Sequence, residues 1–331
     1  MQIHEIKTQE AGQRLDKFLH KYMPEATTSF FYKMLRKKNI TLNGKKAEGK
    51  EMLKEGDQIS FFFSDETFTK FRGASSQDFH TSEYEKAYRT IKGIQIIYED
   101  EDALIINKPA GVLSQKAKPA DVSLNEWLIG YLLKNGGISS EELKTFKPSI
   151  CNRLDRNTSG LVLCGKSLKG SQQLTKLIRE RDVKKFYHTI VVGNMNKSAL
   201  IDGYLYKDEK TNKVTIYPTG ATNIPKEADL IKTAYKPLES IGRFTLLEVE
   251  LITGKTHQIR AHLASIGHPI VGDTKYGDYK VNKELEGKIG LKWQLLHAHR
   301  LEFPKLQEGL IALDGKVIIA ETPKIFKDIK A

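Results

Sequence analysis

The feature that most constrains this chain is the nine-residue stretch Asn152–Gly160, which reads Asn-Arg-Leu-Asp-Arg-Asn-Thr-Ser-Gly. Asp155 lies between Arg153 and Arg156, and the apolar residues 161–163 that follow predict a buried strand. We therefore expect the carboxylate in a loop that a core strand holds in place, and its cationic neighbours favour the ionised form. An alternative interpretation is that Asp155 only caps a turn, with Arg156 in solvent.

Length and charge narrow the class of protein. A chain of 331 residues has room for a large core and a smaller second module. The net charge of +12 indicates a polyanionic partner, which is RNA, DNA or anionic lipid. Residues 1–20 lack the apolar centre of a signal peptide, and no apolar run is long enough to span a bilayer. A lipid partner would need an anchor or a strongly amphipathic basic helix, and neither dominates here. We therefore expect a cytoplasmic protein with no membrane partner, whose two cysteines, Cys151 and Cys164, stay reduced.

Residues 1–64 predict a small basic module. Apolar residues at helical spacing predict a first helix, whose buried face consists of Leu15, Phe18, Leu19 and Tyr22. Ser29 is expected to cap a second helix, and the pair at 43–44, Asn-Gly, predicts a tight hairpin. The candidate contacts of this module to a polyanion are Arg14, Lys17, Arg36, Lys37, Lys38, Asn43 and Lys45. The alternative is an ordinary solvated basic surface.

Residues 65–90 are polar with scattered aromatics, and predict a linker between two domains. A large domain is expected over 91–326. Its apolar patterns predict strands near 94–97, 103–106, 184–192 and 245–251, and helices near 124–132 and 174–178. Thr256 is the expected cap of a further helix that ends at Gly267, and residues 202–236 predict an inserted hairpin arm.

Two ligand-binding interpretations of residues 253–268 fail on spacing. The Gly-Lys-Thr run at 254–256 would need a glycine at position 249 to form a phosphate-binding loop, and that residue is valine. His257, His262 and His268 have no acidic or cysteine partner at zinc-ligand spacing. We therefore expect no metal and no nucleotide cofactor.

The stretch Asn152–Gly160 resembles the motif of the RluA-type RNA pseudouridine synthases, usually His-Arg-Leu-Asp-x-x-Thr-Ser-Gly. Eight of the nine positions fit, and Asn152 replaces the usual His. Further family elements follow in family order. They are Lys-Pro-Ala-Gly at 108–111, Lys-x-Tyr at 185–187, Thr-Gly-Lys-Thr-His-Gln-Ile-Arg at 253–260, Val-Gly-Asp-x-x-Tyr-Gly at 271–277 and Leu-Leu-His-Ala at 295–298. Residues 1–64 resemble the small RNA-binding domain first seen in a small-subunit ribosomal protein.

The resemblance implies an α+β fold, with a central, mostly antiparallel sheet and flanking helices behind the small N-terminal RNA-binding domain. It maps the catalytic aspartate onto Asp155, the active-site tyrosine onto Tyr187, and the cation that pairs with the carboxylate onto Arg260. The activity it implies is isomerisation of uridine to pseudouridine in RNA, most resembling the large-subunit ribosomal RNA branch, without a cofactor. The candidate phosphate contacts of the large domain are Arg153, Arg156, Lys184 and Lys255.

Two other functions stay open at this point. The first is a catalytically silent RNA-binding or ribosome-assembly factor, against which the presence of all three candidate catalytic residues argues. The second, weaker alternative is a nucleoside hydrolase, whose usual second carboxylate is not evident near Asp155.

Overall fold

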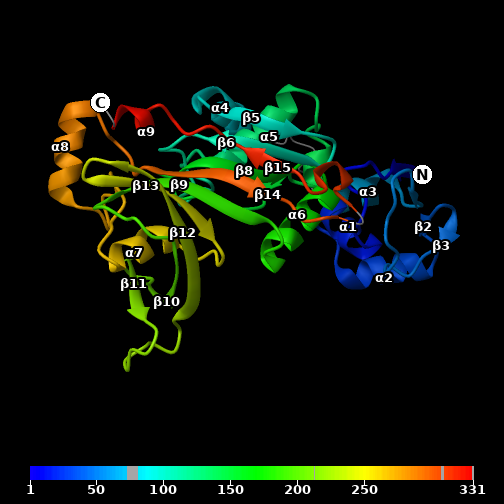
Figure 1. Ribbon diagram of the computed structural model, residues 1–331. Coiled ribbons are helices and arrows are strands. Elements are labelled where there is room, and N and C mark those ends of the chain that lie inside the picture. Colours follow the sequence, from blue (N-terminus) through cyan, green and yellow to red (C-terminus); the bar gives the residue numbers. More distant parts are fainter. Residues whose placement is uncertain (73–80, 212, 307–308, 330–331) are drawn as a thin grey trace.

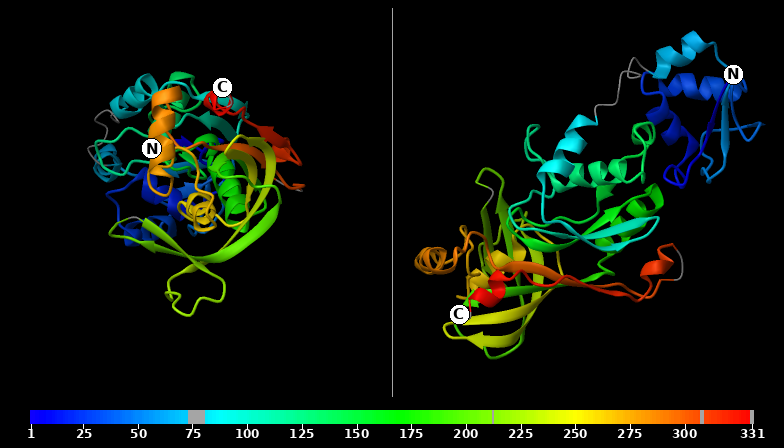
Figure 2. Two further views of the ribbon diagram at one scale, coloured as in Figure 1. Left: turned by 60° about the vertical axis from the view of Figure 1, so that its left-hand side comes forward. Right: turned by 90° about the horizontal axis from the view of Figure 1, so that it is seen from above.

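A computed structural model of the chain describes residues 1–72, 81–211, 213–306 and 309–329. Within these residues the fold is α+β, as predicted, with a four-stranded sheet in an N-terminal module and an eleven-stranded sheet in a large domain (Figure 1). The N-terminal module and the hairpin formed by β10 (Ala199–Asp208) and β11 (Lys213–Pro218) lie at opposite ends of the molecule (Figure 2). None of the described helices combines the length and the apolar character needed to span a bilayer.

The N-terminal module packs helices against a sheet in the strand order β1-β4-β2-β3. Its elements are β1 (Gln2–Glu5), α1 (Leu15–Tyr22), α2 (Thr28–Arg36), β2 (Ile40–Leu42), β3 (Lys45–Lys46) and β4 (Gln58–Phe61). The four predicted apolar residues of α1 are all buried. The predicted hairpin is present, because Asn43 and Gly44 both have the positive φ that its turn requires. The predicted cap Ser29 is wrong: Thr27 caps α2, since its hydroxyl accepts the N–H of Phe30 at 3.3 Å.

Two helices lie within the stretch 65–90 that was expected to be a linker. They are α3 (Asp65–Arg72) and α4 (Ser82–Thr90); residues 73–80 lie outside the described residues. Phe68 of α3 is buried in the core of the N-terminal module, and Tyr84 and Ala87 of α4 pack in the core of the large domain. One or two buried apolar side chains are enough to dock such short helices on a core. Because the other residues of this stretch are mostly polar, the sequence showed no apolar periodicity that would predict these helices. The domain boundaries at 64 and 91 stay a prediction.

The large sheet has the order β11-β10-β12-β13-β9-β14-β8-β6-β5, with β15 beside β14 and β7 beside β8. The pairs are antiparallel except β14 with β8, so the predicted mostly antiparallel sheet is confirmed. Its other strands are β5 (Gln95–Glu99), β6 (Ala103–Lys108), β7 (Ser149–Ile150), β8 (Ser159–Gly165), β9 (Lys184–Val192), β12 (Asp229–Ile241), β13 (Phe244–Leu251), β14 (Leu296–Glu302) and β15 (Val317–Ile319).

Helices cover this sheet on both faces. They are α5 (Leu124–Lys134), α6 (Leu168–Glu180), α7 (Gln258–Ser265), α8 (Tyr279–Ile289) and α9 (Ile325–Asp328), with 3₁₀ turns η1 (Glu142–Lys144) and η2 (Ile311–Leu313). Every residue of β8 is buried: Val162 packs in one cluster with α5, whereas Leu161 and Leu163 pack in another with α6. A strand covered on both faces explains why its sequence is continuously apolar.

The hairpin arm predicted over 202–236 is confirmed as strands β10, β11 and the start of β12, which extend away from the rest of the large domain (Figure 1). At the opposite end, the N-terminal module contacts the large domain through Glu10. Its carboxylate is buried and accepts the hydroxyl of Thr145 at 2.5 Å, while the N–H of Leu168 donates to the carbonyl of Gln9.

Candidate active site

The loop that carries Asp155 joins β7 to β8 and is tied down on both sides of the carboxylate. The side-chain oxygen of Asn152 accepts the N–H of Leu163 at 2.7 Å. Ser114 bonds both backbone groups of Leu154, at 3.1 and 2.7 Å. Asn152, the one departure from the family motif, thus anchors the loop to β8, and Asp155 stands on a fixed backbone.

A buried lysine ties the loop of Asp155 to the neighbouring segment 109–112. The Lys108 ammonium donates to three carbonyls, those of Pro109, Val112 and Arg156, at 2.9–3.1 Å. Gly111 and Arg156 add two bonds between the same segments, at 2.8 and 3.1 Å. Burial lowers the pKa of Lys108 to about 7, although the negative charge of Asp155 opposes this. The Lys-Pro-Ala-Gly element at 108–111 therefore holds the backbone beside Asp155.

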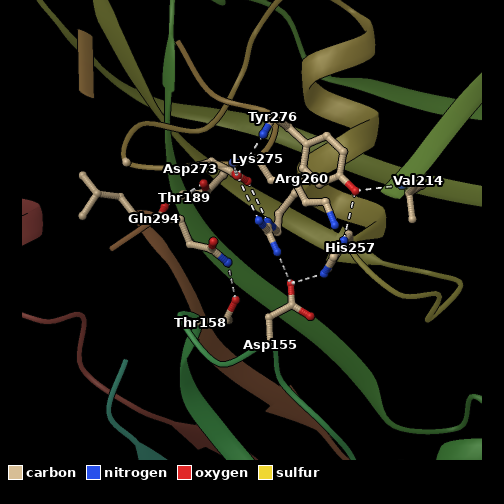
Figure 3. Close-up of polar contacts among 12 residues, drawn as sticks. Asp155, Thr158, Thr189, Val214, His257, Arg260, Asp273, Lys275, Tyr276 and Gln294 are labelled. Atoms are coloured by element: carbon tan, nitrogen blue, oxygen red, sulfur yellow. Dashed lines mark hydrogen bonds and ion pairs between the residues drawn. The ribbon is translucent and has the colours of Figure 1, made fainter. Parts of the chain in front are cut away.

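Arg260 of α7 lies between two carboxylates (Figure 3). Its Nη1 donates to Asp155 at 2.8 Å, and its Nε and Nη2 donate to Asp273 at 2.7 and 2.9 Å. Burial disfavours the charge of Arg260, but the bonds to Asp273 and Asp155 outweigh it and raise the pKa of the guanidinium. The side chain of Asp273 is fully buried, so this pair fixes the guanidinium and leaves one N–H edge for Asp155.

His257 precedes α7 in a left-handed conformation with φ of 55°. Thr256, the expected cap, is not the cap residue; instead the Gln258 side chain accepts the N–H of Lys255 at 3.1 Å and holds the turn. The Nδ1 of His257 lies 3.0 Å from the hydroxyl of Tyr276, and its Nε2 lies 3.9 Å from the Oδ2 of Asp155 (Figure 3). The imidazole is thus the second nitrogen group, after Arg260, that faces the carboxylate.

Tyr187 reaches the site from β9, where it pairs in register with Val249 on one side and Ala298 on the other. Its side chain is 6 % exposed and lines the cavity at Asp155. Burial, and then the charge of Asp155, raise the pKa of Tyr187, so the phenol is neutral at physiological pH.

The cavity at this site has a volume of about 810 Å³, which is within the usual range for small-molecule sites. Asp155, Tyr187 and Arg260 line it together, as predicted, and so do Arg153, Arg156 and Lys255. Lys184 does not line it; its neighbour Lys185 does, with Lys116 and Lys207. Alternation along β9 explains the difference, because adjacent side chains point to opposite faces.

The N-terminal candidate contacts lie on a separate surface from this cavity. Lys17, Arg36, Lys37, Lys38 and Lys45 are exposed. Two others are held within the module: Arg14 pairs with Asp16 at 2.6 Å, and the side chain of Asn43 bonds Asp57 and Gln58 at 2.8 Å. A role of these residues in binding RNA stays a prediction.

The three histidines of 257–268 do not converge. His262 contacts the hydroxyl of Thr233 at 3.0 Å, and His268 contacts the carbonyl of Val192 at 2.9 Å, whereas His257 faces Asp155. In the described part of the chain, no three His, Cys, Asp or Glu side chains gather in a way that would hold a metal ion.

Comparison with known proteins gives the family. Residues 102–265 match the model for RNA pseudouridylate synthase. The chain is 32 % identical over 309 residues to ribosomal large subunit pseudouridine synthase C of Vibrio parahaemolyticus, and this alignment covers 92 % of this chain and 88 % of that protein. The chain belongs to the RNA pseudouridylate synthase family.

Other relatives of this pseudouridine synthase agree. It is 32 % identical over 311 residues to an uncharacterised RNA pseudouridine synthase of Mycoplasma genitalium, with 91 % of this chain and 89 % of that one covered. The structure of human RNA pseudouridylate synthase domain containing 4 has the same fold, with a TM-score of 0.59 and 24 % identity over 75 % of this chain and 95 % of that one. Residues 13–59 match the S4 domain, so the synthase carries an RNA-binding module at its N-terminus.

Three residues of the synthase site had no role in the sequence analysis. Asp273, Tyr276 and His257 were predicted only as members of family elements, and His257 was rejected as a metal ligand. A signal was present, because an aspartate and a tyrosine three residues apart follow the predicted helix that carries Arg260. Their role could not be inferred until α7 and the loop after it were seen to pack together at Asp155.

Proposed function

We propose that this pseudouridine synthase isomerises specific uridines in large-subunit ribosomal RNA, in the cytoplasm. Relatives that align with most of the chain are named for the large ribosomal subunit, and the net charge of +12 suits a polyanionic substrate. The observation that carries the proposal is the Asp155 carboxylate, paired with Arg260 at 2.8 Å, in a cavity whose other charged side chains are cationic.

The reaction needs few groups. The N1–C1′ bond of the uridine breaks, the uracil turns, and a C5–C1′ bond forms; the proton lost from C5 is balanced by one gained at N1. No redox change and no net hydrolysis occur. One carboxylate close to C1′ therefore suffices, and Asp155 acts there by attack on C1′, by stabilising positive charge, or by removing a sugar proton.

Arg260 and Tyr187 support that carboxylate in different ways. Arg260 donates to the Asp155 carboxylate at 2.8 Å, which fixes its orientation and offsets its negative charge. Tyr187, a neutral phenol at the cavity wall, offers its ring to stack on the flipped uracil and its hydroxyl to the base. Its part in removing the C5 proton is proposed from the family resemblance.

The substrate base must leave its stack to reach Asp155, at a cost of about a few kcal/mol. Contacts to phosphates supply this energy. In the large domain we assign these contacts to Arg153, Arg156 and Lys255, which line the cavity. Lys184 does not line the cavity, and we assign it a contact to a phosphate outside the cavity. In the N-terminal module we assign them to the exposed residues Lys17, Arg36, Lys37, Lys38 and Lys45.

Replacing Asp155 by asparagine tests the proposal, because it keeps the shape of the side chain but removes its charge. Pseudouridine in a large-subunit RNA fragment should become undetectable after incubation, while filter binding of the same fragment stays similar or rises slightly. Arg153→Gln is the control, and should weaken binding while pseudouridine still forms at saturating enzyme. A silent RNA-binding factor would yield no pseudouridine with the wild type, and full activity of Asp155→Asn would refute the role of Asp155.

A further inference from the structure

The hydrogen bonds around Tyr276 bear on which nitrogen of a neutral His257 carries its proton. The Tyr276 hydroxyl accepts the N–H of Val214, on the outer edge of β11, at 3.0 Å. Its own hydrogen then has the Nδ1 of His257 within reach, also at 3.0 Å. We assign the hydrogen to this bond, so that Nδ1 accepts and the single proton of a neutral imidazole lies on Nε2.

The surroundings of His257 favour this neutral form. Burial lowers the pKa of the imidazole; Asp155 and Asp273 raise it, while Arg260 and Lys275 lower it. A neutral His257 thus presents one N–H from Nε2 into the cavity, and its position is fixed by the Tyr276 bond and by its place at the start of α7 (Figure 3).

His257 and Asp155 lie at a separation that one oxygen atom, placed to the side of the line between them, can bridge. Nε2 lies 3.9 Å from Oδ2 of Asp155, which is too long for a direct hydrogen bond. An oxygen placed about 2.8 Å from both atoms would accept from Nε2 and donate to the carboxylate at an angle near 90°. A hydroxyl or a water molecule combines these two roles; among the oxygens of a uridine nucleotide only a hydroxyl does, because a carbonyl or phosphate oxygen has no proton to donate.

We propose that His257 recognises the 2′-hydroxyl of the target nucleotide and, with Asp155, distinguishes ribose from deoxyribose. This inference rests on the proposed function, in which Asp155 acts at C1′: the hydroxyl nearest to that carbon is the one on C2′. The contact would position C1′ against the carboxylate as well as select the sugar. His257 is then a residue that binds substrate, and Tyr276 is a positioning residue that acts through it.

Two substitutions of His257 distinguish the effect of losing its N–H donor from the effect of changing the backbone conformation at this position. Asparagine tolerates the left-handed conformation of this position, but its amide reaches only the place of Nδ1, so His257→Asn removes the donor. Glutamine is longer, and His257→Gln places an amide N–H near the position of Nε2. His268→Asn is the matched control, because His268 bonds a backbone carbonyl and does not line the cavity.

The experiment uses the full chain and a ribosomal RNA fragment that the wild type converts, prepared with uridine or with 2′-deoxyuridine at the target position. Single-turnover rates are measured at saturating enzyme. For the uridine fragment, His257→Asn should be slower than the wild type by about 10- to 100-fold. For the deoxyuridine fragment the two enzymes should differ little, so the ribose preference collapses. His257→Gln should restore part of it, Tyr276→Phe should show a smaller loss, and His268→Asn should show none.

An equal slowing of His257→Asn on both fragments would overturn the inference, because it would indicate a merely structural role. An unchanged preference would overturn it too. If the deoxyuridine fragment gives no product with any enzyme, the ratio of the equilibrium affinities for the two fragments replaces the ratio of rates, with the same two outcomes. Absence of pseudouridine with the wild type on every ribosomal fragment would refute the proposed function itself, which is a different result.

Discussion

At the scale of single residues, the site depends on one arginine shared between two acids. Asp273 is fully buried and makes two bonds to Arg260, so it holds the edge that meets Asp155. Asp273→Asn should lower the free energy of unfolding by about 3–5 kcal/mol, because it leaves a buried cation short of one partner. The single-turnover rate should fall as well, since Arg260 loses its fixed position. Denaturant unfolding and a rate assay measure the two effects.

The control for Asp273→Asn is Glu248→Gln, which breaks the ion pair of Glu248 with Arg300 at 2.9 Å. Both of these side chains are partly exposed, so we expect a loss of at most about 1 kcal/mol. Similar losses for the two substitutions would contradict a special role of Asp273.

A buried histidine makes stability depend on pH. His297 is fully buried; its Nε2 donates to the carbonyl of Ala320, its Nδ1 accepts from Ser159, and burial lowers its pKa to about 4. The unfolded chain binds this proton near pH 6.5 and the folded chain only near pH 4, so stability is full above the higher value and is lost as the pH falls. Between pH 7 and pH 4 this histidine should remove on the order of 2–3 kcal/mol.

The measurement compares urea unfolding of the wild type and of His297→Gln at several pH values. Glutamine keeps a donor and an acceptor but does not titrate in this range. The stability difference between the two proteins should therefore shrink as the pH falls towards 4. A difference that is constant with pH would show that His297 does not contribute to acid sensitivity.

At this scale the sequence indicated which residues belong to the site, but not which side chains contact one another. Asp155 and Arg260 could be paired only by the family resemblance, since 105 positions separate them. Cation contacts were less well predicted: alternation along the expected strand places Lys185, and not Lys184, on the face of Tyr187, and the choice of Lys184 overlooked this.

At the scale of elements, two glycines in helices make a matched test of close packing. At Gly130 of α5, a Cβ atom would lie 2.2 Å from the carbonyl oxygen of Tyr84 in α4; at Gly287 of α8 nothing lies within 4 Å. Gly130→Ala should destabilise the protein by about 1–3 kcal/mol, because the backbones must separate. Gly287→Ala should stabilise it by up to about 1 kcal/mol through helix propensity. Thermal unfolding of both variants measures these changes in stability. Stabilisation by Gly130→Ala would contradict the close packing of Gly130 against Tyr84.

Periodicity predicted the elements that bury a regular apolar face. This holds for α1, α5 and β8, whose positions follow from the apolar pattern alone. It failed for β1, whose residues are mostly exposed, and for α3 and α4, each of which buries only one or two residues. Contacts made after folding decide such elements, and a local pattern does not contain them.

At the scale of the whole molecule, charge should control RNA affinity. If about six phosphates are contacted, affinity should fall on the order of a thousandfold between about 50 and 200 mM salt. Lys37→Gln and Lys45→Gln should each reduce the slope of log affinity against log salt by about 1. Lys324→Gln, an exposed lysine near α9, should leave it unchanged. Filter binding over a salt series measures this, and a flat titration would rule out phosphate-driven binding.

The distribution of charge in the cavity has a consequence for how an RNA strand can enter. Among the described residues that line it, Asp155 is the sole acid, whereas the other charged side chains are cationic. A neutral uracil ring meets no electrostatic penalty beside that carboxylate, whereas a phosphate there would be repelled by it. We therefore expect the base and the sugar of one nucleotide at the centre of the cavity and the anionic backbone at its perimeter, as in a nucleotide turned out of its strand.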